Sequence, residues 1–223
     1  MGYLDKEKLM FSNSEFQRIQ NVNVLIAGAG GLGTHLAQQL YRTGIKKIYI
    51  YDNDKIVETN LNRQILYGKN DIGKYKVKCL KKKLDSLKLN TKVVAINEKI
   101  KKNSILPEKV NLIYDALDNF ESRFILENLA LKNNIPLIHA GIYSWFGQIT
   151  TIMPNKNLSL KEIFEAKNYK EDSIPSLSPA VSAVASIQAV EGLKVYLNKS
   201  NTLIKKLLII DLNDYSFQII NLK

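Results

Sequence analysis

A glycine-rich loop joins an apolar run to a helical pattern near the start of the chain, and this junction constrains the fold more than any other feature. Residues 22–27 are short and apolar, as expected for a strand buried in a parallel sheet. Residues 28–33 read GAGGLG. Leucines then recur at every fourth position from Leu32 to Leu40, and the pattern ends at Gly44, a residue type common at helix C-caps. The order strand, glycine loop, helix predicts one unit of a nucleotide-binding α/β fold.

Strand-like and helical segments alternate along most of the chain. Further strands are predicted at 48–52, 92–97, 111–115, 136–140 and 147–153, and a helix at 121–132. The lysine-rich run 74–83 is predicted to be a helix with a buried stripe of Val77, Leu80, Leu84 and Leu87. This alternation predicts an α/β fold with a doubly wound, mostly parallel sheet of the Rossmann type.

The pattern changes after the last of these strands. Residues 154–178 are polar and irregular, and a connection of this length predicts a mobile functional loop that crosses the sheet. Residues 180–197 form an apolar, buried helix, and 207–211 with 216–221 form a terminal β-hairpin that extends the sheet. We therefore expect one domain over residues 1–223. It comprises a helical segment (1–20), a nucleotide-binding half (21–140) and a second half (141–223).

The glycine loop predicts a phosphate site. Glycines at positions 28, 30, 31 and 33 (Gly28, Gly30, Gly31, Gly33) let the backbone approach a phosphate, and the helix that follows offers free N–H groups to it. Asp52 ends the next strand, where a carboxylate accepts hydrogen bonds from ribose hydroxyls. These features alone fit NAD, FAD and ATP equally well.

A polar cluster after the ribose acid favours ATP over a hydride-transfer cofactor. Asp54, Asn60, Arg63 and Gln64 follow in one loop, and Lys76 starts the next helix. A triphosphate carries about four negative charges, and its leaving pyrophosphate needs fixed cations. Arg63 offers a planar fork of donors and Lys76 a compact point charge. A hydride-transfer enzyme has no need of such a cluster.

A second carboxylate is predicted at the same edge of the sheet. Asp118 and Asn119 follow the strand at 111–115, so they lie where ligands of doubly wound sheets bind. A carboxylate there suits Mg²⁺, which takes few protein ligands and keeps waters and phosphate oxygens. The alternative is that Asp118 only caps the helix that starts near Phe120.

Five motifs together resemble one protein family. GAGGLG, D-x-D-x5-NLNRQ, IGKYK, DALDN and GQIT occur in this order, and the similarity runs from about residue 15 to the C-terminus. The chain resembles the ubiquitin-activating-enzyme-like adenylyltransferases, the family of the ThiF, MoeB and HesA proteins. The resemblance implies a homodimer that binds ATP and Mg²⁺. It also implies adenylation of the C-terminal glycine carboxylate of a small ubiquitin-like sulfur carrier ending in Gly-Gly, for thiamine or molybdopterin-type cofactor synthesis.

The resemblance also implies roles for individual residues. The second half, 141–223, binds the carrier. Arg63, Lys76 and Asp118 are the catalytic residues, and Asp118 holds Mg²⁺. The nucleotide-binding residues are Gly28, Gly30, Gly31, Gly33, Asp52, Asp54, Asn60, Arg63, Gln64, Lys76 and Asn119. Family members add an N-terminal Arg from the partner subunit, and here Lys6 stands in the corresponding stretch, 3–7.

The chain departs from the family at its cysteines. Many relatives bind structural zinc with two C-x-x-C pairs, but Ser159 and Glu162 stand where the first pair would lie, so no zinc is expected. The only cysteine, Cys79, lies among apolar neighbours and is predicted to be core filler. Adenylation needs no thiol, because the carrier carboxylate is itself the nucleophile.

The amino-acid composition limits which kinds of partner and which cellular compartment are expected. The net charge is +11, but only four of the basic residues are Arg and the Lys residues are spread along the chain, so a nucleic-acid role is not favoured. No apolar run is long enough to cross a membrane and no signal peptide is evident, so a cytoplasmic protein is expected. Two alternatives stay open: adenylation of another carboxylate, such as a modified tRNA base or a peptide, and a non-catalytic relative.

Overall fold

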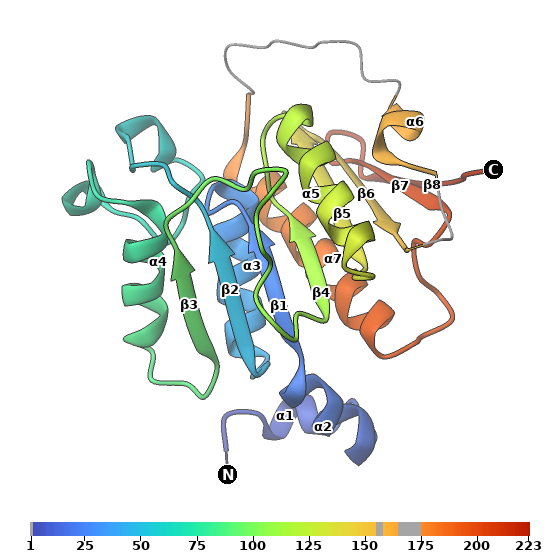
Figure 1. Ribbon diagram of the computed structural model, residues 1–223, viewed down its shortest axis with the longest axis horizontal. Helices are drawn as coiled ribbons and strands as arrows, with labels where there is room; N and C mark the ends of the chain where they lie inside the picture. Colours follow the sequence, from blue (N-terminus) through green and yellow to red (C-terminus); the bar gives the residue numbers. More distant parts are fainter. Residues whose placement is uncertain (1, 155–157, 165–174) are drawn as a thin grey trace.

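The computed structural model describes residues 2–154, 158–164 and 175–223. Eight strands of these residues form one sheet with the order β3-β2-β1-β4-β5-β6-β7-β8 (Figure 1). The strands are β1 (Asn23–Ala27), β2 (Lys47–Tyr51), β3 (Lys92–Ile96), β4 (Leu112–Asp115), β5 (Leu137–Tyr143), β6 (Phe146–Ile152), β7 (Lys206–Asp211) and β8 (Ser216–Asn221). Neighbouring strands from β3 to β5 are parallel, and β6, β7 and β8 are added antiparallel. The predicted fold class and the terminal hairpin are therefore confirmed.

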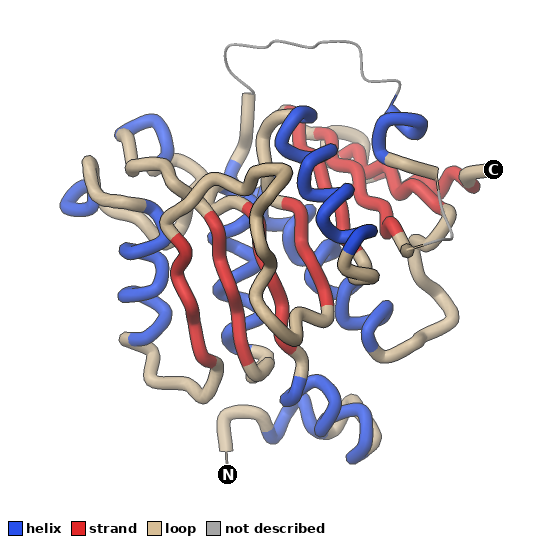
Figure 2. The backbone as a smooth tube through the Cα atoms, viewed as in Figure 1, coloured by secondary structure: helices blue, strands red, loops and turns tan. Residues whose placement is uncertain are grey.

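Helices cover both faces of the parallel part of the sheet (Figure 2). They are α1 (Asp5–Lys8), α2 (Asn13–Asn21), α3 (Gly31–Arg42), α4 (Lys76–Asp85), α5 (Phe120–Lys132), α6 (Leu160–Phe164) and α7 (Ser178–Tyr196), with short 3-10 turns at Glu58–Asn60 and Lys69–Asp71. One apolar cluster joins the sheet to α3, α4 and α7, and a second joins the opposite face to α5 and α6. Every residue of β1 is buried, because alternate side chains point to opposite faces and both faces are covered.

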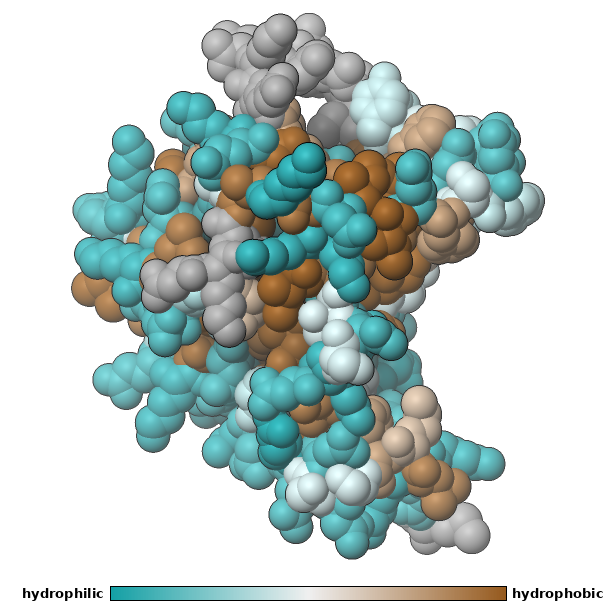
Figure 3. All heavy atoms as spheres, turned by 90° about the vertical axis from the view of Figure 1, so that its right-hand side faces the viewer, coloured by the Kyte–Doolittle hydropathy of each residue, from teal (hydrophilic) through white to brown (hydrophobic). Residues whose placement is uncertain are grey.

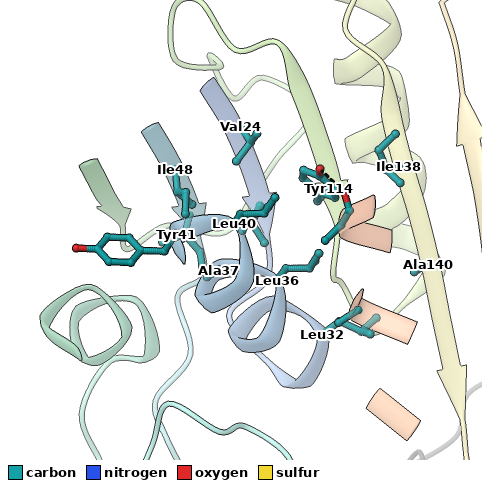
Figure 4. Close-up of a cluster of buried hydrophobic side chains, with 14 of the residues drawn as sticks. Val24, Leu32, Leu36, Ala37, Leu40, Tyr41, Ile48, Tyr114, Ile138 and Ala140 are labelled. Carbon is teal, nitrogen blue, oxygen red and sulfur yellow. Dashed lines mark hydrogen bonds between the residues drawn. The ribbon is translucent and has the colours of Figure 1, made fainter. Parts of the chain in front are cut away.

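The largest cluster is built around α3 and α7 (Figure 4). Leu36 and Leu40 of α3 are fully buried, as the four-residue leucine spacing predicts. Tyr114 of β4 is also fully buried, and its hydroxyl donates to the Ala189 carbonyl of α7 over 3.3 Å. A Cβ at Gly192 would lie 2.1 Å from the Tyr114 hydroxyl oxygen, so only glycine allows α7 to approach the sheet this closely.

Two local expectations need correction. Leu87 was predicted to lie in the buried stripe of the lysine-rich helix, but α4 ends at Asp85 and Leu87 is 38% exposed. Residues 154–178 were predicted to be irregular, but they contain α6, which is too short to show helical periodicity in the sequence. Residues 155–157 and 165–174, and therefore most of the predicted mobile loop, lie outside the described residues.

The N-terminal helices lie at the amino ends of the parallel strands, opposite the edge to which the arrowheads point (Figure 1). Gly44 follows α3 with a φ of +71°, as its predicted place after the helix requires. A Cβ there would lie 2.6 Å from Leu4 Cδ1, so this turn also seats the N-terminal segment. No helix of the described residues is both long enough and apolar enough to cross a membrane.

Candidate active site

The candidate site lies where the order of the strands reverses. β1 leads outward to β2 and β3 on one side, and β4 and β5 continue on the other. The carboxyl ends of β1 and β4 therefore carry loops that diverge, and ligands of doubly wound sheets bind in the crevice between such loops. A cavity of about 380 Å³ occupies this place.

The structure brings ten of the predicted site residues together around this cavity. They are Gly28, Gly30, Gly31, Asp52, Asp54, Arg63, Gln64, Lys76, Asp118 and Asn119. These residues come from the loops after β1, β2 and β4 and from the start of α4. Residues far apart in the sequence thus converge on one space.

Three predicted residues do not line this cavity. Gly33 lies inside α3, where a Cβ would be 1.9 Å from the Gly28 carbonyl oxygen, so its role is close packing of the helix on the loop. Asn60 lines an adjoining, more open depression of about 680 Å³, and its Oδ1 accepts the Val57 N–H over 3.1 Å. Lys6 is exposed on α1, at the opposite end of the sheet (Figure 1).

The glycine loop is held in place by its backbone contacts. Gly28 has a φ of +103°, which favours glycine, and a Cβ there would lie 2.4 Å from the Ala116 carbonyl oxygen. The next N–H, that of Ala29, donates to Asp52 Oδ2 over 2.8 Å. Among the described residues, the N–H groups of Gly30 and Gly31 have no backbone or side-chain acceptor. Free N–H groups at the start of α3 are what an anion requires.

Asp52 connects the ribose side of the site to the loop. Its other oxygen, Oδ1, accepts the Asp54 N–H over 2.7 Å. Burial raises the pKa of Asp52, and the nearby Lys76 ammonium and the two N–H donors oppose this rise. The carboxylate is therefore partly desolvated, and further hydrogen-bond donors such as ribose hydroxyls would stabilise its charged form.

Lys76 is buried and paired, which its sequence position did not reveal. Its Nζ lies 2.8 Å from Asp54 Oδ2, and its backbone N–H donates to the Asp54 carbonyl over 3.0 Å. The Lys76 side chain is only 9% exposed, whereas that of Asp54 is 60% exposed. Asp54 therefore neutralises and orients the ammonium at the rim of the cavity.

Arg63 carries a guanidinium that forms no ion pair with any described residue. Its Nη1 donates to the Thr59 carbonyl over 3.0 Å and to Asn62 Oδ1 over 2.9 Å, both uncharged acceptors. A Cβ at Gly31 would lie 3.6 Å from Arg63 Cγ, so the side chain passes directly beside the glycine loop. His35 of α3 lies beside this segment: burial lowers the pKa of His35, and the nearby Arg63 backbone opposes that fall.

Asp118 does not cap α5. Asn119 does so instead, because its Oδ1 accepts the Ser122 N–H over 2.9 Å. The Asn119 amide also donates to Asp118 Oδ1 over 3.0 Å. The second carboxylate oxygen of Asp118 remains available on an exposed side chain that lines the cavity.

Arg123 is a further residue of this region that the sequence did not single out. It is 8% exposed, its Nη2 donates to the Leu117 carbonyl over 2.7 Å, and its Nε lies 3.6 Å from Asp115 Oδ2. The same Asp115 oxygen lies 2.6 Å from His139 Nδ1 in a fully buried pair. This network fixes the loop just before Asp118. The available signal was that Arg123 is the only Arg in the helix after DALDN.

Ser159 and Glu162, which stand where the first cysteine pair was expected, form hydrogen bonds with each other. Ser159 Oγ and Glu162 Oε2 lie 2.7 Å apart, and the Ser159 N–H donates to the same oxygen over 2.7 Å. The described residues contain no group of three His, Cys, Asp or Glu side chains arranged to hold a metal. Cys79 is 7% exposed within the core, as predicted.

A glycine loop at a strand-order reversal, with cations and a free carboxylate around one cavity, defines a nucleotide-binding protein of the doubly wound class. Comparison with known families shows which family of this class the chain belongs to. The ThiF family matches residues 6–223, and the chain belongs to this family.

Curated relatives carry names that agree with the adenylyltransferase predicted from the motifs. The chain is 28% identical over 209 residues to the SAMP-activating enzyme E1 of Haloferax volcanii, covering 90% of this chain and 77% of the relative. It is 28% identical over 214 residues to the sulfur carrier protein adenylyltransferase of Thermus thermophilus, covering 91% and 79%. It is 30% identical over 186 residues to the sulfur carrier protein ThiS adenylyltransferase of Bacillus subtilis, covering 80% but only 55% of that relative.

Solved structures agree on the fold. The crystal structure of E. coli MccB superposes with a TM-score of 0.85 at 21% identity, covering 99% of this chain and 70% of MccB. The crystal structure of PaaA superposes with a TM-score of 0.77 at 23% identity, covering 93% of this chain and 66% of PaaA.

Proposed function

We propose that this protein is an ATP-dependent adenylyltransferase that activates the C-terminal glycine carboxylate of a small ubiquitin-like sulfur carrier. The pathway is sulfur transfer for a thiamine or molybdopterin-type cofactor. One observation carries the proposal: the Gly30 and Gly31 N–H groups, the Arg63 guanidinium, the Lys76 ammonium and the Asp118 carboxylate all border one cavity of about 380 Å³. The relatives named sulfur carrier adenylyltransferases support the choice of substrate.

The chemistry needs alignment and charge neutralisation rather than a base. The carrier carboxylate is ionised at neutral pH, so its oxygen attacks the α-phosphorus directly. The new O–P bond forms as the bond to pyrophosphate breaks, and the negative charge moves onto the leaving group. Fixed cations stabilise that charge, and an enclosed site holds the two reactants in line.

Each site residue has a place in this scheme. Gly30 and Gly31 bind phosphate oxygens through their N–H groups, with Gly28 shaping the turn, and Asp52 binds the ribose. Arg63 and Lys76 contact the leaving phosphates, and Asn60 and Gln64 line the same side. The buried Oε1 of Gln64 has no hydrogen-bond partner among the described residues, and as an acceptor it fits a donor such as a ribose hydroxyl or a water molecule rather than a phosphate oxygen.

Asp118 is proposed to hold Mg²⁺ with help from Asn119. The fit rests on its donor set: the side chain is exposed at the cavity, and one carboxylate oxygen is unused by α5. Magnesium needs few protein ligands when phosphates and waters supply the rest, and when bound it neutralises phosphate charge.

Lys6 can serve this scheme only across subunits. α1 lies at the end of the sheet remote from the cavity (Figure 1), so Lys6 cannot complete the site of its own chain. We propose a homodimer in which Lys6 of one protomer approaches the triphosphate of the other.

An exposed apolar surface supports a protein partner. All six residues of β8 are exposed, including Phe217 at 58% and Ile219 at 57%. Apolar atoms gather on the face that looks to the right of Figure 1, where β8 is the outermost strand (Figure 3). A carrier seated there would direct its tail along the sheet toward the cavity.

ATP–pyrophosphate exchange tests the proposal. We expect exchange to require a candidate carrier ending in Gly-Gly and to vanish with the same carrier lacking its last glycine. Absence of exchange with every such carrier would overturn the carrier assignment. RNA binding that weakens steeply with salt would instead favour a tRNA carboxylate as the substrate.

A further inference from the structure

Tyr67 is a buried tyrosine beside the glycine loop that no part of the proposed chemistry uses. It lies four residues after Arg63 and is 7% exposed. Its hydroxyl donates to the Ala29 carbonyl oxygen over 2.8 Å. Burial and the nearby Asp52 carboxylate raise the pKa of Tyr67, so the hydroxyl keeps its proton and acts as a donor.

Ala29 is therefore held on both sides. Its N–H donates to Asp52 Oδ2 and its carbonyl accepts from Tyr67, each over 2.8 Å. Ala29 itself is fully buried, so no solvent competes for either group. The two bonds fix the orientation of the peptide units before and after this residue.

The second of these peptide units contains the N–H of Gly30. A trans peptide is planar, and its C=O and N–H point in opposite directions. The described residues contain no cis peptide bond. With the Ala29 carbonyl directed at Tyr67, the Gly30 N–H must point away from Tyr67. Gly30 lines the cavity, and its N–H has no acceptor among the described residues.

The hydrogen bond from the Tyr67 hydroxyl to the Ala29 carbonyl also connects the turn that carries Arg63 to the glycine loop. Gln64 accepts the Tyr67 N–H through its carbonyl over 3.1 Å, and Asn60 accepts the Gln64 N–H over 2.9 Å, so residues 60–67 form a continuous bonded turn that includes Arg63. The Tyr67 hydroxyl attaches this turn to the loop after β1. The backbone of the turn that carries Arg63 and the Gly30 N–H are thereby held in one relative position.

We propose that Tyr67 is a positioning residue that aims the Gly30 N–H, and with it the Arg63 turn, at the polyphosphate of the nucleotide. This inference rests on the proposed ATP site and adds to it the residue that orients its phosphate donors. Tyr67 does not touch the nucleotide; it acts through the Ala29 carbonyl.

The test compares Tyr67→Phe with a matched control, Tyr41→Phe. Both substitutions keep the ring and remove a buried hydroxyl that donates to a backbone carbonyl, in Tyr41 that of Leu89 over 3.3 Å. Calorimetric titration gives the affinities for ATP and for adenosine. We expect Tyr67→Phe to weaken ATP binding about fivefold to tenfold, the effect of one lost hydrogen bond, with adenosine affinity unchanged. Tyr41→Phe should leave both affinities unchanged.

Two outcomes separate this inference from the proposed function. If wild type binds no ATP, the proposed function fails. If wild type binds ATP and Tyr67→Phe keeps the wild-type ratio of ATP to adenosine affinity, the positioning role is wrong and the hydroxyl is merely structural.

A second measurement needs no variant. In wild-type protein followed by NMR, inorganic triphosphate should shift the Gly30 amide resonance, and adenosine should not. A Gly30 amide that ignores triphosphate would overturn the positioning role even if Tyr67→Phe did not fold.

Discussion

The parallel and antiparallel parts of the sheet differ in what covers them. β1 is buried along its whole length between helices on both faces, whereas every residue of β8 is exposed. The predicted nucleotide residues other than Lys6 follow strands of the parallel part or begin the helix beside it. The antiparallel part ends in an open edge strand, β8, that presents apolar side chains, whereas β6 and β7 still contribute buried residues to the core. We propose that nucleotide chemistry takes place at the parallel part and that the protein partner is recognised at β8, within one continuous sheet.

The largest effect expected in the parallel part comes from Asp118. Asp118→Ala should reduce ATP–pyrophosphate exchange about a thousandfold or more, because it removes the proposed metal-holding carboxylate. The melting temperature should not change, since the side chain is exposed and caps no helix. Asp85→Ala, at an exposed aspartate at the end of α4, is the control and should keep wild-type exchange. Near-normal exchange in Asp118→Ala would show that this role is wrongly assigned.

Arg63 should give the next largest effect. Arg63→Ala should raise the activation free energy of exchange by about 2–4 kcal/mol, as expected when one preorganised charge is lost from a leaving group. Steady-state exchange rates measure this change. Arg42→Ala, an exposed arginine in the last turn of α3, should keep the wild-type rate. Equal rates in the two variants would contradict a role for the unpaired guanidinium.

A substitution in β8 should affect the partner but not the nucleotide. Phe217 and Ile219 share one face of the strand, because side chains alternate. The double variant Phe217→Ser with Ile219→Ser should weaken carrier binding about tenfold, as expected for lost apolar contact area. Its ATP affinity should match wild type. Leu9→Ser, at a leucine 85% exposed on the N-terminal segment, is the control. A changed ATP affinity in the double variant would break the separation of the two parts.

The smallest effect concerns pH. Burial raises the pKa of Asp52 above its ordinary 3.8, so as pH falls the carboxyl takes up a proton earlier than an exposed aspartate does. Protonation removes an acceptor of the ribose hydroxyls. As the pH is lowered, adenosine affinity should therefore begin to decrease while the pH is still above 3.8. Calorimetry at a series of pH values measures this loss. Asp52→Asn should bind adenosine more weakly with no such pH dependence, and a flat wild-type profile would exclude the proposed contact.

The same carboxyl has the opposite effect on folding stability. Because its folded pKa is raised, its contribution to the free energy of unfolding is fully present below the unfolded pKa and is lost as pH rises through the folded value. Denaturant unfolding of apoprotein would show this dependence, and Asp52→Asn would remove it.

Local signals predicted the parallel part well. The glycine loop, the alternating apolar runs and the polar residues at strand ends are all encoded within short windows, and parallel topology brings those ends to one edge. The choice of Asn119 rather than Asp118 as the helix cap depends on backbone geometry that the sequence DN does not distinguish. The sequence pattern therefore could not predict that Asn119 is the N-cap of α5.

Contacts between distant segments were not predictable. The Lys76–Asp54 pair spans 22 residues and buries a lysine that looks solvated in the sequence. The Tyr67 contact with Ala29 spans 38 residues and carries no motif. The Tyr67 contact depends on how the loops after β1 and β2 fold over each other, and the Lys76 pair depends on how the loop after β2 returns to its own start. Likewise, Leu87 is apolar but exposed, because the helix ends before reaching it.

A crystal structure with ATP and magnesium tests the central claim most directly. We expect the Gly30 and Gly31 N–H groups, the Arg63 guanidinium and the Lys76 ammonium to contact one triphosphate, with Asp118 on its metal. A nucleotide bound elsewhere, or these groups directed at separate places around it, would contradict the account.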